Sequence, residues 1–221
     1  MKRMFALLKT DIGRKALMGV TGLLLIGFLI SHMAANLLVL FDADGYNAYS
    51  HALVSNPLIY VAEFGLVALF VGHFVSGIRV TLRNRAARPV GYQRTAKQGT
   101  SGRKSLASST MIVSGLTMLL FVPLHLITFK FGAWYETGDG SMRDLHRLVI
   151  EVFQNPLHTA WYLLALPILG MHAWHGFGSG FESLGTAYSA GLRRAGQALA
   201  VLITLGFMAV PVYVLLGGGA S

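Results

Sequence analysis

Long runs of apolar residues alternate with short polar segments along most of the chain. Five of these runs exceed the roughly 20 residues that an α-helix needs to cross a bilayer. They cover residues 16–41, 57–82, 106–131, 157–182 and 195–217. The pattern predicts an all-α membrane protein in which five transmembrane helices form a single membrane-anchor domain over residues 1–221.

The composition supports this class. Hydrophobic residues make up 54% of the 221 positions and charged residues only 12%, which is too apolar for one soluble domain of this size. Cysteine is absent. Its absence excludes disulfides, thiolate metal sites and cysteine-ligated iron–sulfur clusters within this chain.

The distribution of positive charge predicts the orientation. The net charge is +9, and basic residues concentrate in the N-terminal tail, in loop 83–104 and in the "GLRR" segment before the last apolar run. Cytoplasmic loops are enriched in Lys and Arg, so we expect the N-terminus inside and the C-terminus outside the cell's inner (cytoplasmic) membrane. We assign the basicity to topology and to contact with membrane lipid, and expect no nucleic-acid partner. The same face also suits an acidic protein partner.

Four histidines within the predicted helices fall at two depths. With a rise of about 1.5 Å per residue, His32 and His125 lie about 25–28 Å from the inner face, and His73 and His172 about 15 Å from it. We call His32 and His125 the outer pair, and His73 and His172 the inner pair. One such histidine alone is commonly a core residue bonded to a carbonyl, but two pairs at matching depths indicate a shared role.

A weak internal repeat supports this pairing. The first predicted helix contains "TGLLLIGFLISH" and the third contains "SGLTMLLFVPLH", each with a small hydroxyl residue, a glycine and a histidine ten residues after the glycine. The second contains "HFVSG" and the fourth "HAWHG", each with a glycine four residues after a histidine. His172 is thus the counterpart of His73, whereas His175 has no counterpart.

Paired histidines suit haem better than a bare metal ion. Copper and zinc sites normally recruit more protein ligands, whereas haem iron needs only two axial imidazoles. Bis-histidine ligation inside a helical bundle is typical of low-spin electron-transfer sites. The pattern therefore predicts four helices bundled around two stacked b-type haems.

Several motifs carry a resemblance to a known family. They are "GRKALMGVTGLLLIGFLISHMAANLL", "YNAYSHALVSNPLIYVAE", "HFVSGIRVTLRNRAARPVGY" and "HAWHGFGSGFESLG". The chain resembles, over nearly its whole length, the di-haem cytochrome b anchor of succinate:menaquinone oxidoreductases, the succinate dehydrogenases and fumarate reductases with five transmembrane helices. The resemblance implies axial haem ligation by His32, His73, His125 and His172.

The same resemblance implies partners and an electron path. A flavoprotein with covalent FAD and an iron–sulfur protein would dock on the cytoplasmic basic face. Electrons from succinate would pass through these partners to the haem of the inner pair, then to that of the outer pair, then to menaquinone near the outer surface. This subunit of complex II would have no catalytic residue for succinate itself.

The quinone site is implied less directly. In related enzymes a carboxylate near the outer ends of the first two helices exchanges protons with the quinone. The corresponding position here falls near Tyr46 and Asn47, where there is no carboxylate. Asp44 and Glu63 are the nearest substitutes, and His51 is another candidate proton carrier.

Four further residues are candidates to support the inner haem. Arg14, Arg79 and Arg83 are near enough to pair with its propionates, since Arg binds carboxylates in a bidentate manner. His175 would lie next to the axial ligands and would form a hydrogen bond to a propionate or a carbonyl.

Two other functions fit parts of the pattern. A di-haem cytochrome b subunit of a hydrogenase or formate dehydrogenase also pairs histidines across helices, but the "NRAARPVGY" segment and the five helices favour the succinate family. A non-haem membrane transporter, with histidines that only bridge helices, would line one pathway with ionisable residues rather than hold two facing pairs.

Overall fold

The computed structural model describes residues 10–86, 106–186 and 189–219, and these residues are almost entirely helical. The helices are α2 (Asp11–Asn36), α3 (Ala43–Ser55), α4 (Leu58–Ala86), α5 (Leu106–His125), α6 (Leu145–Gln154), α7 (Pro156–Ser183) and α8 (Ala190–Leu215). A 3₁₀ turn, η1 (Leu37–Leu40), extends α2, and a π-helical turn, η2 (Leu126–Lys130), extends α5. No strand forms within the described residues, so the predicted all-α class is confirmed.

Four helical segments are long and apolar enough to cross a membrane. They are Ile12–Leu40, Leu58–Arg83, Thr110–Lys130 and Ala190–Leu215. They coincide with the first, second, third and fifth of the predicted spans, so multi-pass membrane character is supported. Basic loop 83–104 lies mostly outside the described residues.

The fourth predicted span, α7, is 28 residues long but is not among those four. It is the helix most surrounded by protein, because it packs along α2, α5 and α8. Its buried face carries small and polar residues such as Thr159, Gly170 and Gly178. A helix covered by its neighbours does not need the apolar surface that lipid contact demands, and small residues allow close packing. Five spans therefore remain a prediction, of which four are supported.

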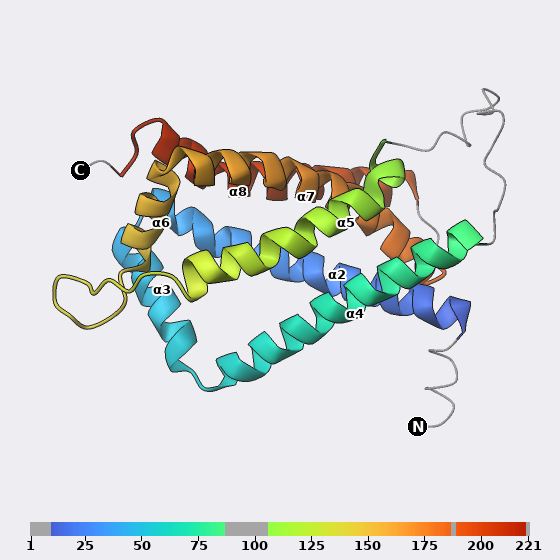
Figure 1. Cartoon of the computed structure of the whole chain (residues 1–221), viewed down its shortest axis with the longest axis horizontal. Coiled ribbons are helices and arrows are strands. Elements are labelled where there is room, and N and C mark those ends of the chain that lie inside the picture. Colours follow the sequence, from blue (N-terminus) through green and yellow to red (C-terminus); the bar gives the residue numbers. More distant parts are fainter. Residues whose placement is uncertain (1–9, 87–105, 187–188, 220–221) are drawn as a thin grey trace.

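The long helices form an antiparallel bundle (Figure 1). The packing contacts between them follow a ring. Helix α2 packs along α4, α4 meets α5, α5 packs along α7, and α7 returns to α2. Helix α8 covers α7 and part of α2 from outside this ring. Two diagonals cross the bundle, one from α2 to α5 and the other from α4 to α7.

The two ends of the bundle carry opposite charge. At the end where α2 and α8 begin, the described basic residues include Arg14, Arg79, Arg83 and Arg193; we call it the basic end. Helices α3 and α6 and the last turn of α8 lie at the other end (Figure 1). That end also holds most of the acidic residues, namely Asp42, Asp44, Glu63, Glu136, Asp139, Asp144 and Glu151, and we call it the acidic end.

Helices α3 and α6 lie at the acidic end, outside the five predicted spans. Each begins at an aspartate whose side chain caps it: Asp42 accepts from the backbone N–H of Gly45 at 2.8 Å, and Asp144 from that of Arg147 at 3.0 Å. Both are far shorter than a membrane span. They are stabilised by packing on each other and, for α6, on α7 and α8, which no local pattern reveals.

Candidate functional site

The four histidines predicted to pair do lie in two facing pairs. In the outer pair, the ring centres of His32 and His125 are 5.8 Å apart and their planes are perpendicular, at 90°. In the inner pair, the ring centres of His73 and His172 are 6.2 Å apart and the planes meet at 77°. The pairing expected from helical depth is therefore the one that the structure contains.

Each pair bridges a diagonal of the bundle. His32 on α2 faces His125 on α5, and His73 on α4 faces His172 on α7. Among the described residues, neither α2 with α5 nor α4 with α7 packs closely along its length. The histidine rings thus approach each other across the centre of the bundle while the helices that carry them stay apart.

The separation of the rings suits an ion held between them. A metal–imidazole bond is about 2.0 Å long, and a ring centre lies about 1.1 Å beyond its nitrogen, so two opposite imidazoles on one metal have centres about 6 Å apart. The observed 5.8 and 6.2 Å agree with this spacing. The rings meet edge to face, an arrangement that two aromatic rings in direct contact also adopt.

Hydrogen bonds at Nδ1 orient both rings of the inner pair. The Nδ1 atom of His73 lies 3.2 Å from the carbonyl oxygen of Met18 and 3.3 Å from the hydroxyl of Thr21. The Nδ1 atom of His172 lies 2.9 Å from the hydroxyl of Ser114. Metal-bound histidines usually donate their second ring N–H in this way, which leaves Nε2 for the metal.

The outer pair is held by different groups. The Nδ1 atom of His125 is 3.0 Å from the hydroxyl of Tyr162 on α7. The Nδ1 atom of His32 is 3.4 Å from the amide nitrogen of Asn36, one turn along the same helix, and that amide bonds the His32 carbonyl at 2.8 Å. At 3.4 Å the ring contact is too long to select a tautomer. Within the described residues, Nε2 of all four histidines makes no hydrogen bond.

His175 and His172 use different ring nitrogens for their hydrogen bonds. Its Nε2 atom lies 3.0 Å from the hydroxyl of Ser179, one turn further along α7. No ring of another helix faces it among the described residues. The structure therefore brings His172, and not His175, opposite His73, as the repeat predicts.

The donor set fits haem and not a bare ion. No group of three or more His, Cys, Asp or Glu side chains that could hold a metal ion occurs in the described part of the chain. A porphyrin supplies four nitrogens and leaves two axial positions, so a pair of imidazoles is sufficient. Gly22 and Gly115 border the inner pair: a Cβ there would lie 3.0 Å from Cε1 of His73 and 3.6 Å from Cε1 of His172. The ligand role of the four histidines remains a prediction.

An unsatisfied donor lies near the outer pair. The indole nitrogen of Trp161 is buried and has no partner within the described residues. Its ring centre is 6.3 Å from that of Phe121, which stacks on His125 at 5.7 Å. Buried N–H groups normally have an acceptor, so this one indicates an acceptor that the described residues do not supply. Sequence reasoning missed Trp161, because only its position next to Phe121, which stacks on His125, distinguishes it.

The five candidate quinone residues are not gathered in one place. Tyr46 is buried, and its hydroxyl donates to the amide oxygen of Asn36 at 3.3 Å, next to His32. Asp44 and His51 are on the exposed side of α3, and Glu63 pairs with Lys130 across the ends of α4 and α5.

Asn47 is buried and already fully engaged. Its amide nitrogen donates to Asp144 at 2.9 Å, and its amide oxygen accepts from the backbone N–H of His146 at 2.9 Å. These bonds connect α3 to the start of α6. Asn47 therefore braces the acidic end, and Tyr46 is the candidate with a link to the outer pair.

We expect Tyr46 to ionise only in strongly alkaline solution. Burial raises its pKa to about 12 from 10.0, and the charge of Arg143 partly opposes this. Because the folded-state pKa lies above the unfolded one, the stabilising effect is complete below pH 10 and is lost as the pH rises through about 12. The two-unit shift corresponds to about 3 kcal/mol of stability.

The ionisation of Tyr46 can be measured by an alkaline titration of tyrosinate absorbance in detergent, carried out on the wild type and on Tyr46→Phe. The curve of the variant is subtracted from that of the wild type. The difference should show one tyrosine that titrates well after the others. Ionisation of Tyr46 together with the exposed tyrosines would contradict its burial.

The arginines predicted near the inner haem lie at the basic end. Arg79 and Arg83 are exposed on α4, and Arg14 is half-buried in the first turn of α2. They share the end of the bundle that is nearer the inner pair. The structure does not bring them together at one point.

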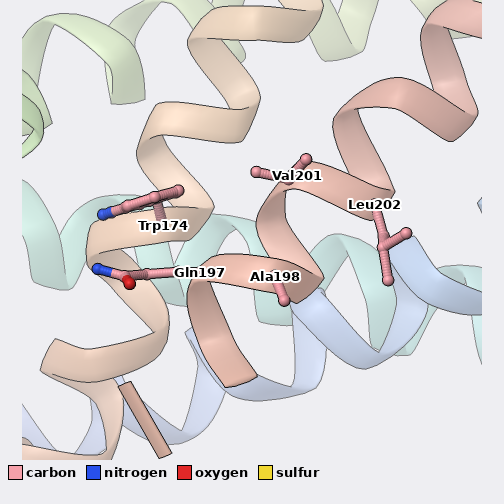
Figure 2. Close-up of a pocket in the computed structure, with 5 residues that line it drawn as sticks. All are labelled: Trp174, Gln197, Ala198, Val201 and Leu202. Atoms are coloured by element: carbon pink, nitrogen blue, oxygen red, sulfur yellow. The ribbon is translucent and has the colours of Figure 1, made fainter. Parts of the chain in front are cut away.

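A shallow groove lies elsewhere, on the outside of the bundle between α7 and α8 (Figure 2). Its volume is about 360 Å³, and it is lined by Trp174, Gln197, Ala198, Val201 and Leu202. Its surface is almost wholly apolar. None of the paired histidines contributes to it, so it is separate from the histidine sites.

Comparison of the chain with family models, with curated proteins and with solved structures gives no match.

Proposed function

We propose that this chain is the di-haem cytochrome b membrane anchor of a succinate:menaquinone oxidoreductase. The observation that carries the proposal is the presence of two facing histidine pairs, each with the ring spacing of an axial ligand pair. The engaged Nδ1 atoms and the distance between the helices on each diagonal support it. The motif resemblance supports the succinate family in particular.

Each residue has a defined task in this proposal. Haem supplies a centre that accepts and releases one electron at a time. His73 and His172 would hold one haem, and His32 and His125 would hold the other. Thr21 contacts His73 and lies eleven residues before His32 on α2, so the two pairs are about 16 Å apart along the helix axis.

The charge of the two ends sets the direction. We place the basic end in the cytoplasm, where the iron–sulfur and flavoprotein subunits dock, and the acidic end outside. With haem bound, the inner pair would then be the side nearer the electron-donating subunits and the outer pair the side nearer the quinone. Arg14, Arg79 and Arg83 are at the end where haem propionates and acidic partner surfaces need positive charge.

Menaquinone binds at the acidic end beside the outer pair in this proposal. Tyr46 and Asn36 form a polar link from the interior of α3 to His32, and Trp161, which packs near Phe121, offers an N–H without a partner among the described residues. Asp44 and His51 are exposed and suited to proton exchange with the outside, and Glu63 is half-buried beside Lys130.

The first test is an absorption spectrum of the purified protein. We expect reduced-minus-oxidised α-bands of b-type haem and a content of two haems per chain. A colourless protein after expression with adequate haem supply would exclude this function and favour the non-haem transporter.

The second test identifies the partner enzyme. A tagged chain isolated from its native membrane should carry an iron–sulfur subunit and a flavoprotein, and should couple succinate oxidation to menaquinone reduction. A haem-loaded chain that brings down a hydrogenase or formate dehydrogenase instead would keep the haem assignment and overturn the choice of family.

A further inference from the structure

Two buried hydroxyl residues occupy equivalent places beside the inner pair. Thr21 on α2 and Ser114 on α5 are the small hydroxyl residues that open the two halves of the internal repeat, and only 4% and 2% of their surfaces are exposed. Each reaches a histidine on the next helix of the bundle. Thr21 lies 3.3 Å from Nδ1 of His73, and Ser114 lies 2.9 Å from Nδ1 of His172.

The other bonds of these hydroxyls define which way the protons point. Thr21 donates to the carbonyl of Leu17 at 2.8 Å, and Ser114 donates to the carbonyl of Met111 at 3.0 Å. While a hydroxyl keeps this bond its single proton is in use, and its oxygen can then only accept from the imidazole N–H.

For His73 the carbonyl oxygen of Met18 requires the same arrangement, since a carbonyl can only accept. His73 therefore carries its proton on Nδ1, and His172 does so as long as Ser114 keeps its bond to Met111. In that tautomer the lone pair is on Nε2, where it can bind a metal.

The residue after each hydroxyl leaves space for the ring. Gly22 follows Thr21 and Gly115 follows Ser114, and these are the glycines that border His73 and His172. At Gly22 a Cβ would approach Cε1 of His73 to 3.0 Å, so the ring would have to move by a few tenths of an ångström, whereas at Gly115 the 3.6 Å approach to Cε1 of His172 is an ordinary contact. Each inner imidazole thus contacts a hydroxyl–glycine pair of the neighbouring helix, and the space is tightest at Gly22.

We propose that Thr21 and Ser114 are positioning residues that keep the two inner histidines in the metal-binding tautomer and set the electron density of their rings. This inference rests on the proposed haem function. A ligand imidazole whose N–H is hydrogen-bonded donates more electron density to the metal, which favours the oxidised state of the iron and lowers its potential. Loss of either hydroxyl therefore raises the potential of the inner haem.

The outer pair supplies an internal reference. Its Nδ1 atoms contact Tyr162 and Asn36 and have no link to Thr21 or Ser114 within the described residues. A change at either hydroxyl should thus act on one haem of the two. A general effect on folding or on the membrane environment would act on both.

The experiment is a redox titration of the two α-bands, with low-spin electron paramagnetic resonance of the oxidised protein, in Thr21→Ala and Ser114→Ala. Thr21→Ser and Ser114→Thr keep the hydroxyl and serve as conservative variants. Thr117→Ala is the matched control, because Thr117 is on α5 one turn beyond Ser114 and its hydroxyl bonds only its own helix, at the carbonyl of Val113. A His73→Ala titration identifies which band belongs to the inner haem.

We expect both alanine variants to shift the potential of the inner haem upward and to change its resonance signal, with the outer haem unaltered. The conservative variants and Thr117→Ala should match the wild type. Loss of the inner haem alone in Ser114→Ala, with retention in Ser114→Thr, would also support the proposal.

Unchanged potentials and signals in both alanine variants of a two-haem protein would overturn the proposal and leave the haem function intact. Equal effects on the two haems would do the same. A wild-type chain that binds no haem would overturn both.

Discussion

Replacing His172 with alanine is expected to halve the haem content, from two haems per chain to one. His172 faces His73 across the α4–α7 diagonal at 6.2 Å, and an iron with one axial imidazole lost is held far more weakly. His73→Ala should have the same effect, because both residues hold the same haem. The remaining haem should keep the spectrum of the outer pair. The haem-to-protein ratio and the reduced α-bands measure this.

His175→Ala is the informative comparison, since this residue is three positions from His172 on the same helix. Its Nε2 bonds Ser179, and it faces no other ring in the described part of the chain. We expect this variant to retain two low-spin haems, as should the control His158→Ala at the exposed start of α7. A variant at 175 that loses a haem, beside a variant at 172 that does not, would show that the ligand in "HAWH" was chosen wrongly.

Replacing Gly19 with leucine is expected to produce the largest loss of stability. Helices α2 and α7 cross closely at Gly19 and Gly180: a Cβ at position 19 would lie 2.9 Å from the carbonyl oxygen of Gly180 and 3.4 Å from its Cα. The obstacle is backbone, which cannot rotate away as a side chain can. Overpacking typically costs about 1–3 kcal/mol, and a whole leucine against backbone is at the upper end.

This substitution should also weaken haem binding, because α2 contributes Thr21 and His32 and α7 contributes His172. The thermal unfolding midpoint in detergent and the haem content measure the two effects. Gly27→Leu is the matched control on the same helix, since position 27 is exposed and nothing lies within 4 Å of a Cβ there. Similar midpoints for the two variants would contradict the close crossing of α2 and α7.

Local sequence pattern determined the class of this protein and the identity of its paired histidines. Apolar runs of spanning length can be read without tertiary information, because a bilayer imposes one length and one polarity on whatever crosses it. Depth along a helix follows from its regular rise, so residue counts alone placed His32 with His125 and His73 with His172. The repeat separated His172 from His175 for the same reason, since it compares equivalent positions on equivalent helices.

Tertiary structure decided everything that depends on how the helices are rotated and which of them are neighbours. That α2 lies diagonally opposite α5 follows from the packing of all the helices together, and so do the contacts from Thr21 and Ser114 to their histidines. Helices α3 and α6 could be recognised only in the folded structure, because packing against other helices stabilises them. Asn47, a candidate quinone residue by position, proved to connect α3 to the start of α6 through hydrogen bonds. Its partners are about a hundred residues away in the chain, so the sequence pattern could not reveal these bonds. The composition and the hydrophobic period of one segment show which of its faces prefers an apolar environment. They do not show which distant segment that face contacts, because this depends on how all the helices pack together.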